Sequence, residues 1–179
     1  MNHITTYTGK HFEPTNPDPE LFDVRDIAHA LSLTCRGNGH VKTFFSVGQH
    51  CIYCAEEAVA RGYSERVVLA CLLHDAGEAY LSDVPRPFKE QLPHYREAEN
   101  RMLDLIYTKF LGSPLTKEEE RKVKEIDDDL LYFDLKELLG QDPGRETPRM
   151  HVKVSFDVRP FEEVERAYLA LYNDYCIEV

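Results

Sequence analysis

An apolar run that ends in ionisable residues constrains this chain more than any other feature of its sequence. Residues 67–73 are all apolar, and His74 and Asp75 follow them directly. A helix that is apolar on every face must be buried. Burying an imidazole and a carboxylate is costly unless a partner compensates them, and a divalent metal ion does so because it takes neutral histidine and ionised aspartate as ligands. The run therefore predicts a buried helix that carries a metal-binding pair.

Length and composition indicate one globular domain over residues 1–179. The net charge of −11 argues against a nucleic-acid polymer as partner, because such partners require a broad basic surface. No apolar stretch is long enough to span a bilayer and no signal peptide is readable, so we expect no membrane association. Five cysteines without regular spacing indicate reduced thiols and a cytoplasmic location.

Cap and turn signals divide the chain into helices joined by proline-containing loops. Ser46 with Gln49, and Thr116 with Glu119, match the capping box that opens a helix. The fold class that follows is all-α, a helical bundle with a minor short β element near the termini. We expect a hairpin in the first twelve residues, a short strand within 152–158, a loop over 82–93, and helices after Asp23, over 46–62, from Ser64 through His74, over about 95–111, over 116–140 and over about 161–175.

The residues after His74 add further acids to the same site. On a continuous helix Glu78 lies one turn beyond His74 on the same face, and Asp83 follows in the next loop. The simpler interpretation is a helix end that becomes polar where it leaves the core. The accumulation of acids favours a common cleft.

The long helix presents three successive acids, of which one faces inward. Asp127 falls within the apolar stripe, whereas Asp128 and Asp129 fall on its flanks and are interpreted as solvated. Asp134 also points inward, where it either supports the metal ligands, forms a salt bridge or makes a helix–helix contact. The stripe itself consists of Val123, Ile126, Leu130 and Leu138.

His50, in the first turn of its helix, supplies a further imidazole. With two imidazoles and two carboxylates the ligand set suits a borderline or hard divalent ion, Co²⁺ or Mn²⁺ first and Mg²⁺, Fe²⁺ or Zn²⁺ as alternatives. Cys51 and Cys54 have C-x-x-C spacing, for which two buried helical thiols are favoured over a zinc or redox site. The expected metal ligands are His50, His74, Asp75 and Asp127.

The order His…His-Asp…Asp, with the strings at residues 46–50 and 74–85, resembles the HD-domain phosphohydrolase superfamily and its small 5′-deoxynucleotidase branch. That branch includes bacterial nucleoside-monophosphate phosphatases, phage dATP-hydrolysing enzymes and a phosphohydrolase of nucleoside-antibiotic biosynthesis. The resemblance implies an all-α bundle, metal ligation by the four residues above, and Glu78 and Asp83 as catalytic acids. Arg36 matches the phosphate-contacting arginine of the branch. Gly48 departs from the pattern, where alanine or a larger residue is common, without affecting a catalytic position.

Basic residues near these acids agree with a phosphate ligand. Arg36 lies in a glycine-containing turn that lets the backbone approach an anion, and its planar fork suits phosphate. For the other basic residues ordinary surface charge is the competing interpretation. The candidate substrate-binding residues are Arg36, His40, Lys42, Arg86 and Lys89.

The sequence thus predicts a metal-dependent phosphohydrolase that removes phosphate from 5′-nucleotides, with purine deoxynucleotides or an analogue preferred. One alternative is a triphosphohydrolase that releases intact triphosphate from deoxynucleoside triphosphates. Another is a nucleotide-binding regulator without catalysis. The expected partner is a small-molecule nucleotide, with a homo-oligomer allowed.

Overall fold

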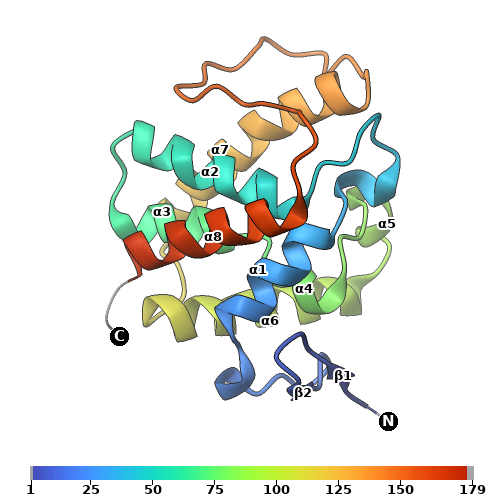
Figure 1. The fold of residues 1–179 in the computed structure, drawn as a ribbon, viewed down its shortest axis with the longest axis vertical. Coiled ribbons are helices and arrows are strands. Elements are labelled where there is room, and N and C mark those ends of the chain that lie inside the picture. The colour runs from blue at the N-terminus through green and yellow to red at the C-terminus, as the bar shows by residue number, and fades with distance from the viewer. Residues whose placement is uncertain (1, 177–179) are drawn as a thin grey trace.

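The computed structural model describes residues 2–176 and is mostly helical, with a small antiparallel hairpin near the N-terminus (Figure 1). The hairpin pairs β1 (Ile4–Thr5) with β2 (His11–Phe12), as its sequence predicts. Gly9 has a φ of +83°, the left-handed conformation that the connecting turn requires. The all-α fold class with a short β element is therefore confirmed at this end of the chain.

The helices begin close to the residues that the cap signals indicate. Side chains of Asp23, Ser46, Ser64 and Thr116 each accept a hydrogen bond from a backbone N–H in the first turn. The helices are α1 (Val24–Leu33), α2 (Val47–Ala60), α3 (Glu65–Leu73), α4 (Glu78–Leu81), α5 (Arg86–Lys89), α6 (Pro93–Leu111), α7 (Lys117–Phe133) and α8 (Phe161–Tyr175), with 3₁₀ turns η1 (Pro19–Leu21) and η2 (Arg36–Gly39) and a π-helical turn η3 (Asp134–Leu138).

Helix α3 lies at the centre, as its apolar sequence predicts. All its residues from 67 to 73 are buried, and α2, α6, α7 and α8 pack around it (Figure 1). The C-terminal helix α8 crosses α1, α2 and α3, and the buried Tyr168 hydroxyl donates to the carbonyl of Leu72 at 2.7 Å. The end of α3 is thereby held in a fixed position within the core.

The structure departs from the expected elements near the site. Helix α3 ends at Leu73, and the backbone continues through a turn with i→i−3 hydrogen bonds before α4 begins at Glu78. The placement of Glu78 one turn beyond His74 on a continuous helix is therefore wrong. The loop predicted over residues 82–93 contains the short helix α5, and α7 passes into the π-helical turn η3.

The strand predicted within residues 152–158 is not formed. Helix α2 supplies the partners for this backbone instead: Tyr53 contacts both the N–H and the carbonyl of Ser155 at 3.2 Å, and the side-chain amide of Gln49 donates to the carbonyl of Asp157 at 3.5 Å. The apolar side chains of Val154 and Phe156 pack on the core. The alternating polarity of residues 152–158 thus belongs to an extended segment that lies on α2. Side chains of α2 supply backbone hydrogen bonds that a neighbouring strand would otherwise supply.

Within residues 2–176, none of the helices combines the length and apolar character needed to cross a membrane.

Candidate metal centre

His74 presents a buried ring nitrogen without a hydrogen-bond partner. Its Nδ1 lies 2.7 Å from the carbonyl oxygen of Cys71, and because a carbonyl only accepts, Nδ1 carries the proton. Its Nε2 is then an acceptor, and it has no hydrogen-bond partner among the described residues. This nitrogen faces Asp75 Oδ2 at 3.4 Å and Asp127 Oδ1 at 3.7 Å. The ring is oriented as histidines that ligate metals are, with the second nitrogen bonded to a carbonyl.

His50 approaches the same carboxylate from α2. It is fully buried, and its Nε2 lies 3.1 Å from Asp127 Oδ1. The rings of His50 and His74 have centroids 5.3 Å apart. Three segments far apart in the sequence, α2, the end of α3 and α7, thus bring the four residues expected as ligands to one place.

Two of the three closest contacts among these atoms have the spacing of neighbouring ligands around one ion. A metal with ligand bonds of about 2.0–2.2 Å holds neighbouring ligand atoms roughly 3.0–3.5 Å apart, and the closest contacts among these atoms are 3.1, 3.4 and 3.7 Å. Burial lowers the pKa of His74, but the charge of Asp75 and the other neighbouring groups, Asp127 among them, together outweigh burial, and the pKa lies well above its ordinary value. The carboxylates therefore attract a cation, either a proton on each imidazole or a metal ion in its place.

Thiols from α2 lie beside the imidazoles. Ligand atoms of His50, Cys54 and His74 all lie within 4.8 Å of one another, and so do those of Cys51, His74 and Asp75. Both cysteines are buried and free, as the favoured interpretation of the C-x-x-C spacing predicts, but each also belongs to a group that could hold a metal ion. The chain therefore contains a buried His/Cys group that could hold a metal ion.

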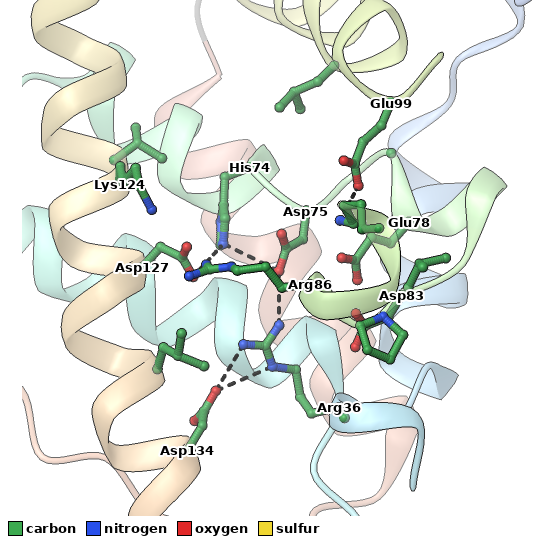
Figure 2. A pocket seen from close by; sticks show the side chains of 18 of the residues that line it. Arg36, His74, Asp75, Glu78, Asp83, Arg86, Glu99, Lys124, Asp127 and Asp134 are labelled. Carbon is green, nitrogen blue, oxygen red and sulfur yellow. Dashed lines mark hydrogen bonds and ion pairs between the residues drawn. The ribbon is translucent and has the colours of Figure 1, made fainter. Parts of the chain in front are cut away.

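A cavity of about 1040 Å³ opens above the centre. Figure 2 shows His74, Asp75 and Asp127 pointing toward one another at its floor, with Glu78 and Asp83 to one side. Helices α6 and α7, the segment between them and the turn η3 contribute apolar side chains to its lining. These are Leu103, Tyr107, Leu115, Val123, Leu131 and Leu135.

Arg36 is held at the edge of the floor by two acids. Its Nε and Nη2 donate to Asp134 Oδ2 at 3.3 and 3.0 Å, and its Nη1 donates to Asp75 Oδ2 at 3.3 Å. Two residues of the turn that carries it, Gly37 and Asn38, have positive φ values of 57° and 52°. Of the three roles left open for Asp134, the structure shows a salt bridge, together with an approach to His50 Nδ1 at 3.1 Å.

Glu78 and Asp83 both line the cavity, although the helix that was expected to align Glu78 is interrupted. Glu78 Oε2 is buried without a hydrogen-bond partner among the described residues. Burial first, and then the charges of Asp75 and Asp83, raise the pKa of Glu78 well above its ordinary value. A carboxyl group with a raised pKa that lines a cavity suits acid–base chemistry.

The other basic residues divide into two groups. His40, Arg86 and Lys89 line the cavity, with Lys89 paired to Glu99. Lys42 is not among the lining residues; its side chain lies against Gly140, and its N–H donates to the carbonyl of Leu138. The structure thus separates Lys42 from the other candidate substrate contacts.

Sequence reasoning missed one wall of the cavity. Glu99, Asn100, Leu103, Asp104 and Tyr107 line it from α6, and Glu120 and Lys124 from α7. The residues of α6 recur at i, i+3, i+4 and i+7 from position 100, so they share one helical face. The available signal was that Asn100 and Asp104 share one helical face with Leu103 and Tyr107.

Comparison with known proteins finds two relatives whose names assign no activity to them. No protein-family model matches the chain. It is 36% identical to the uncharacterized protein YfdR of Escherichia coli (strain K12) over 110 residues, which cover 62% of this chain and 59% of YfdR. It is 28% identical to the uncharacterized protein RCAP_rcc00048 of Rhodobacter capsulatus over 180 residues, which cover 93% of this chain and 91% of that protein. The chain is similar to both, and its chemistry must be argued from its own site.

Proposed function

We propose that this chain is a metal-dependent phosphohydrolase that removes phosphate from 5′-nucleotides, with purine deoxynucleotides or their analogues preferred, and that residues 1–179 form one domain of the HD type. The observation that carries the proposal is the buried Nε2 of His74, which faces Asp75 and Asp127 at the floor of a cavity. Buried polar atoms are normally hydrogen-bonded, whereas this nitrogen has only long contacts of 3.4 and 3.7 Å to the two carboxylates, which an ion held between them would account for.

The mixed nitrogen and oxygen donors support a borderline or hard ion over a thiolate-bound one. His74, Asp75 and Asp127 line the cavity, where a substrate can reach them. Burial raises the pKa of the Cys51 thiol, which keeps it protonated and a poor ligand. A divalent ion, Co²⁺ or Mn²⁺ first, supplies Lewis-acid chemistry at such a site by polarising a phosphoryl oxygen and making water more acidic. The ligands proposed to hold it are His50, His74, Asp75 and Asp127.

Arg36 is proposed to bind and orient the phosphate. Its guanidinium is fixed by Asp134 on one edge, while its Nη1 edge points toward Asp75 and the cavity floor. A cation already held in place needs no reorganisation when negative charge develops on the phosphate oxygens. His40, Arg86 and Lys89 lie on the cavity wall, where they can contact the rest of the nucleotide.

Glu78 and Asp83 are proposed to hold the mobile protons. The raised pKa of Glu78 keeps a proton on a carboxyl group that lines the cavity, so Glu78 can deliver it to the leaving 5′ oxygen. Asp83 also lines the cavity and is proposed to accept a proton from the attacking water.

The apolar walls are proposed to exclude water and to bind the base and sugar. Ligand pockets for molecules of nucleotide size are commonly several hundred to about 1,000 Å³ in volume, and this cavity has about 1040 Å³. Leu103, Tyr107 and Leu131 offer apolar contact on opposite sides of it.

A matrix of metal ions against nucleotides, run on metal-stripped protein, tests the proposal. Orthophosphate is expected from dAMP when Co²⁺ or Mn²⁺ is restored, and no product without an ion. Release of intact triphosphate from dATP would instead show that the chain is a triphosphohydrolase. Nucleotide binding without any product would show that the chain is a nucleotide-binding regulator without catalysis.

The Glu78→Gln variant separates proton transfer from metal binding. Because Glu78 is proposed to move a proton and not to hold the ion, the variant should keep its metal content while kcat falls by about 10²–10⁴-fold. Metal content is measured by elemental analysis and kcat by phosphate release. The matched control is Glu125→Gln, an exposed acid that pairs with Arg61 away from the cavity. Loss of metal with the rate, or an unchanged rate, would contradict the assignment.

A further inference from the structure

Asp134 is a buried carboxylate that the proposed chemistry does not use. It is only 5% exposed and is the first residue of the π-helical turn η3 that continues α7. Its Oδ2 accepts hydrogen bonds from Arg36 Nε and Nη2 and lies 3.1 Å from His50 Nδ1. A single oxygen thus touches both the residue proposed for phosphate and a residue proposed for metal.

The His50 ring is flanked by carboxylates on both of its nitrogens. Asp127 lies 3.1 Å from Nε2, and Asp134 lies 3.1 Å from Nδ1. Asp127 and Asp134 are seven residues apart, about two helical turns, so both point from one face of the helix. To ligate through Nε2, the ring must carry its proton on Nδ1.

Among residues 2–176, His50 Nδ1 has no better partner, whereas the Asp134 Oδ2 that it approaches also accepts hydrogen bonds from Arg36. His50 Nδ1 and Asp134 Oδ1 are both buried, and neither makes a hydrogen bond within the described residues. The contact to Oδ2 is at ion-pair distance without full hydrogen-bond alignment. Histidines that ligate metals commonly donate their second N–H to a carboxylate, which fixes the ring and raises its basicity.

Arg36 depends on the same carboxylate for its orientation. Asp134 receives the Nε and Nη2 edge of the guanidinium, which leaves Nη1 directed at Asp75. Without Asp134, the buried guanidinium would retain only Asp75 as a hydrogen-bonded acid among the described residues and would compete with an ion for it.

We infer that Asp134 is a positioning residue that orients both His50 toward the metal ion and Arg36 toward the phosphate, so that the two affinities depend on one carboxylate. The inference rests on the proposed function only for the identity of the two ligands.

Calorimetry with Mn²⁺ and then with inorganic phosphate tests this without requiring turnover. Asp134→Asn is expected to weaken Mn²⁺ binding by about 10–100-fold and to weaken phosphate binding to the Mn²⁺-loaded protein by about 10-fold. Asp134→Glu, which keeps a carboxylate, should recover part of both losses. The matched control is Glu137→Gln, which removes an exposed charge from the same turn and should stay within about twofold of the wild type.

The outcomes separate the inference from the proposed function. A folded Asp134→Asn variant that keeps either affinity overturns the inference, as does a wild-type chain that binds neither probe. If both losses occur but no nucleotide is hydrolysed, the proposed function fails and the inference stands. Should Asp134→Asn not fold, ¹⁵N-histidine NMR of the Zn²⁺-loaded wild type decides, because the inference requires a protected proton on His50 Nδ1 and metal on Nε2.

Discussion

At the scale of single residues, three adjacent aspartates in α7 acquire different roles from their partners. Asp128 accepts a hydrogen bond from Lys124 at 3.0 Å, and Asp129 accepts one from Arg61 at 2.9 Å. Asp129 is therefore paired and not simply solvated as its flanking position suggested. Asp127 faces the imidazoles of His50 and His74 instead. A lysine or arginine partner satisfies each outer acid, and the inner one is left for an ion.

A second question at the residue scale is which donor atoms would hold the proposed metal ion. Cys54 Sγ lies 3.5 Å from His50 Nε2, so a thiolate is within reach of the centre. Neither Cys54 nor Cys51 is among the residues that line the cavity, whereas Asp75 and Asp127 are. The carboxylates are therefore expected to outcompete the thiols for a hard or borderline ion.

The absorption spectrum of Co²⁺-loaded protein checks this expectation. Because Co²⁺–thiolate bonds produce charge-transfer absorption in the near ultraviolet, the wild type should lack that band and Cys54→Ser should have the same spectrum. Cys176→Ser, at an exposed cysteine, serves as the control. A band that disappears in Cys54→Ser alone would show that the His/Cys group binds the ion.

At the scale of elements, Gly48 explains how closely α2 approaches its neighbours. A Cβ atom at this position would meet the carbonyl carbon of Leu31 at 3.2 Å, the backbone nitrogen of Ser32 at 3.2 Å and Val164 Cγ1 at 3.1 Å. Two of these atoms are backbone and cannot rotate away. The glycine that departs from the family pattern therefore allows α1 and α8 to pack tightly on α2.

Gly48→Ala is expected to destabilise the protein despite the better helix propensity of alanine. Overpacking against backbone costs about 1–3 kcal/mol, and the helix gains back about 1 kcal/mol, so the free energy of unfolding should fall by about 1 kcal/mol. Urea unfolding followed by circular dichroism measures it. Gly62→Ala is a contrasting variant, because its Cβ meets no atom within 4 Å and only its φ of +71° is strained. Stabilisation by Gly48→Ala would show that the helices can separate without cost.

At the scale of the whole molecule, Glu57 joins α2 to a distant segment. Its fully buried carboxylate accepts hydrogen bonds from Arg61 Nε, from the ring and backbone of His151, and from the backbone of Val152, at 2.8–3.0 Å. Burial raises the pKa of Glu57, but the bonds from His151 and Arg61 outweigh burial and lower it below its ordinary value of 4.5. The ionised carboxylate thus fastens residues 151 and 152 to the core.

Because the pKa of Glu57 is lower in the folded chain, its stabilisation is fully present above about pH 4.5 and is lost as the pH falls through the folded value. Glu57→Gln should therefore lower the free energy of unfolding by about 2 kcal/mol at pH 7, with the difference from wild type shrinking below pH 4. Urea titrations at several pH values measure this. Glu56→Gln, at the preceding residue, should not lower the free energy of unfolding in this way at pH 7. A difference that stays constant with pH would contradict the role assigned to the charge.

Much of this protein follows from patterns within a few residues of sequence. Apolar residues 67–73 had to be buried, capping residues such as Ser46 and Thr116 set helix starts, and helical periodicity alone selected Asp127 from three adjacent acids. These features are local, because they depend on the spacing of side chains along one helix.

The tertiary structure alone decided which of these residues meet. It ended α3 at Leu73, placed Lys42 beside Gly140 and not in the cavity lining, and paired Arg36 with Asp134 across 98 positions of sequence. It also left Nε2 of His74, the imidazole that ends the apolar run, without a hydrogen-bond partner among residues 2–176. Such contacts depend on how helices pack against one another, and packing is set by shape across the whole core, which no local pattern contains.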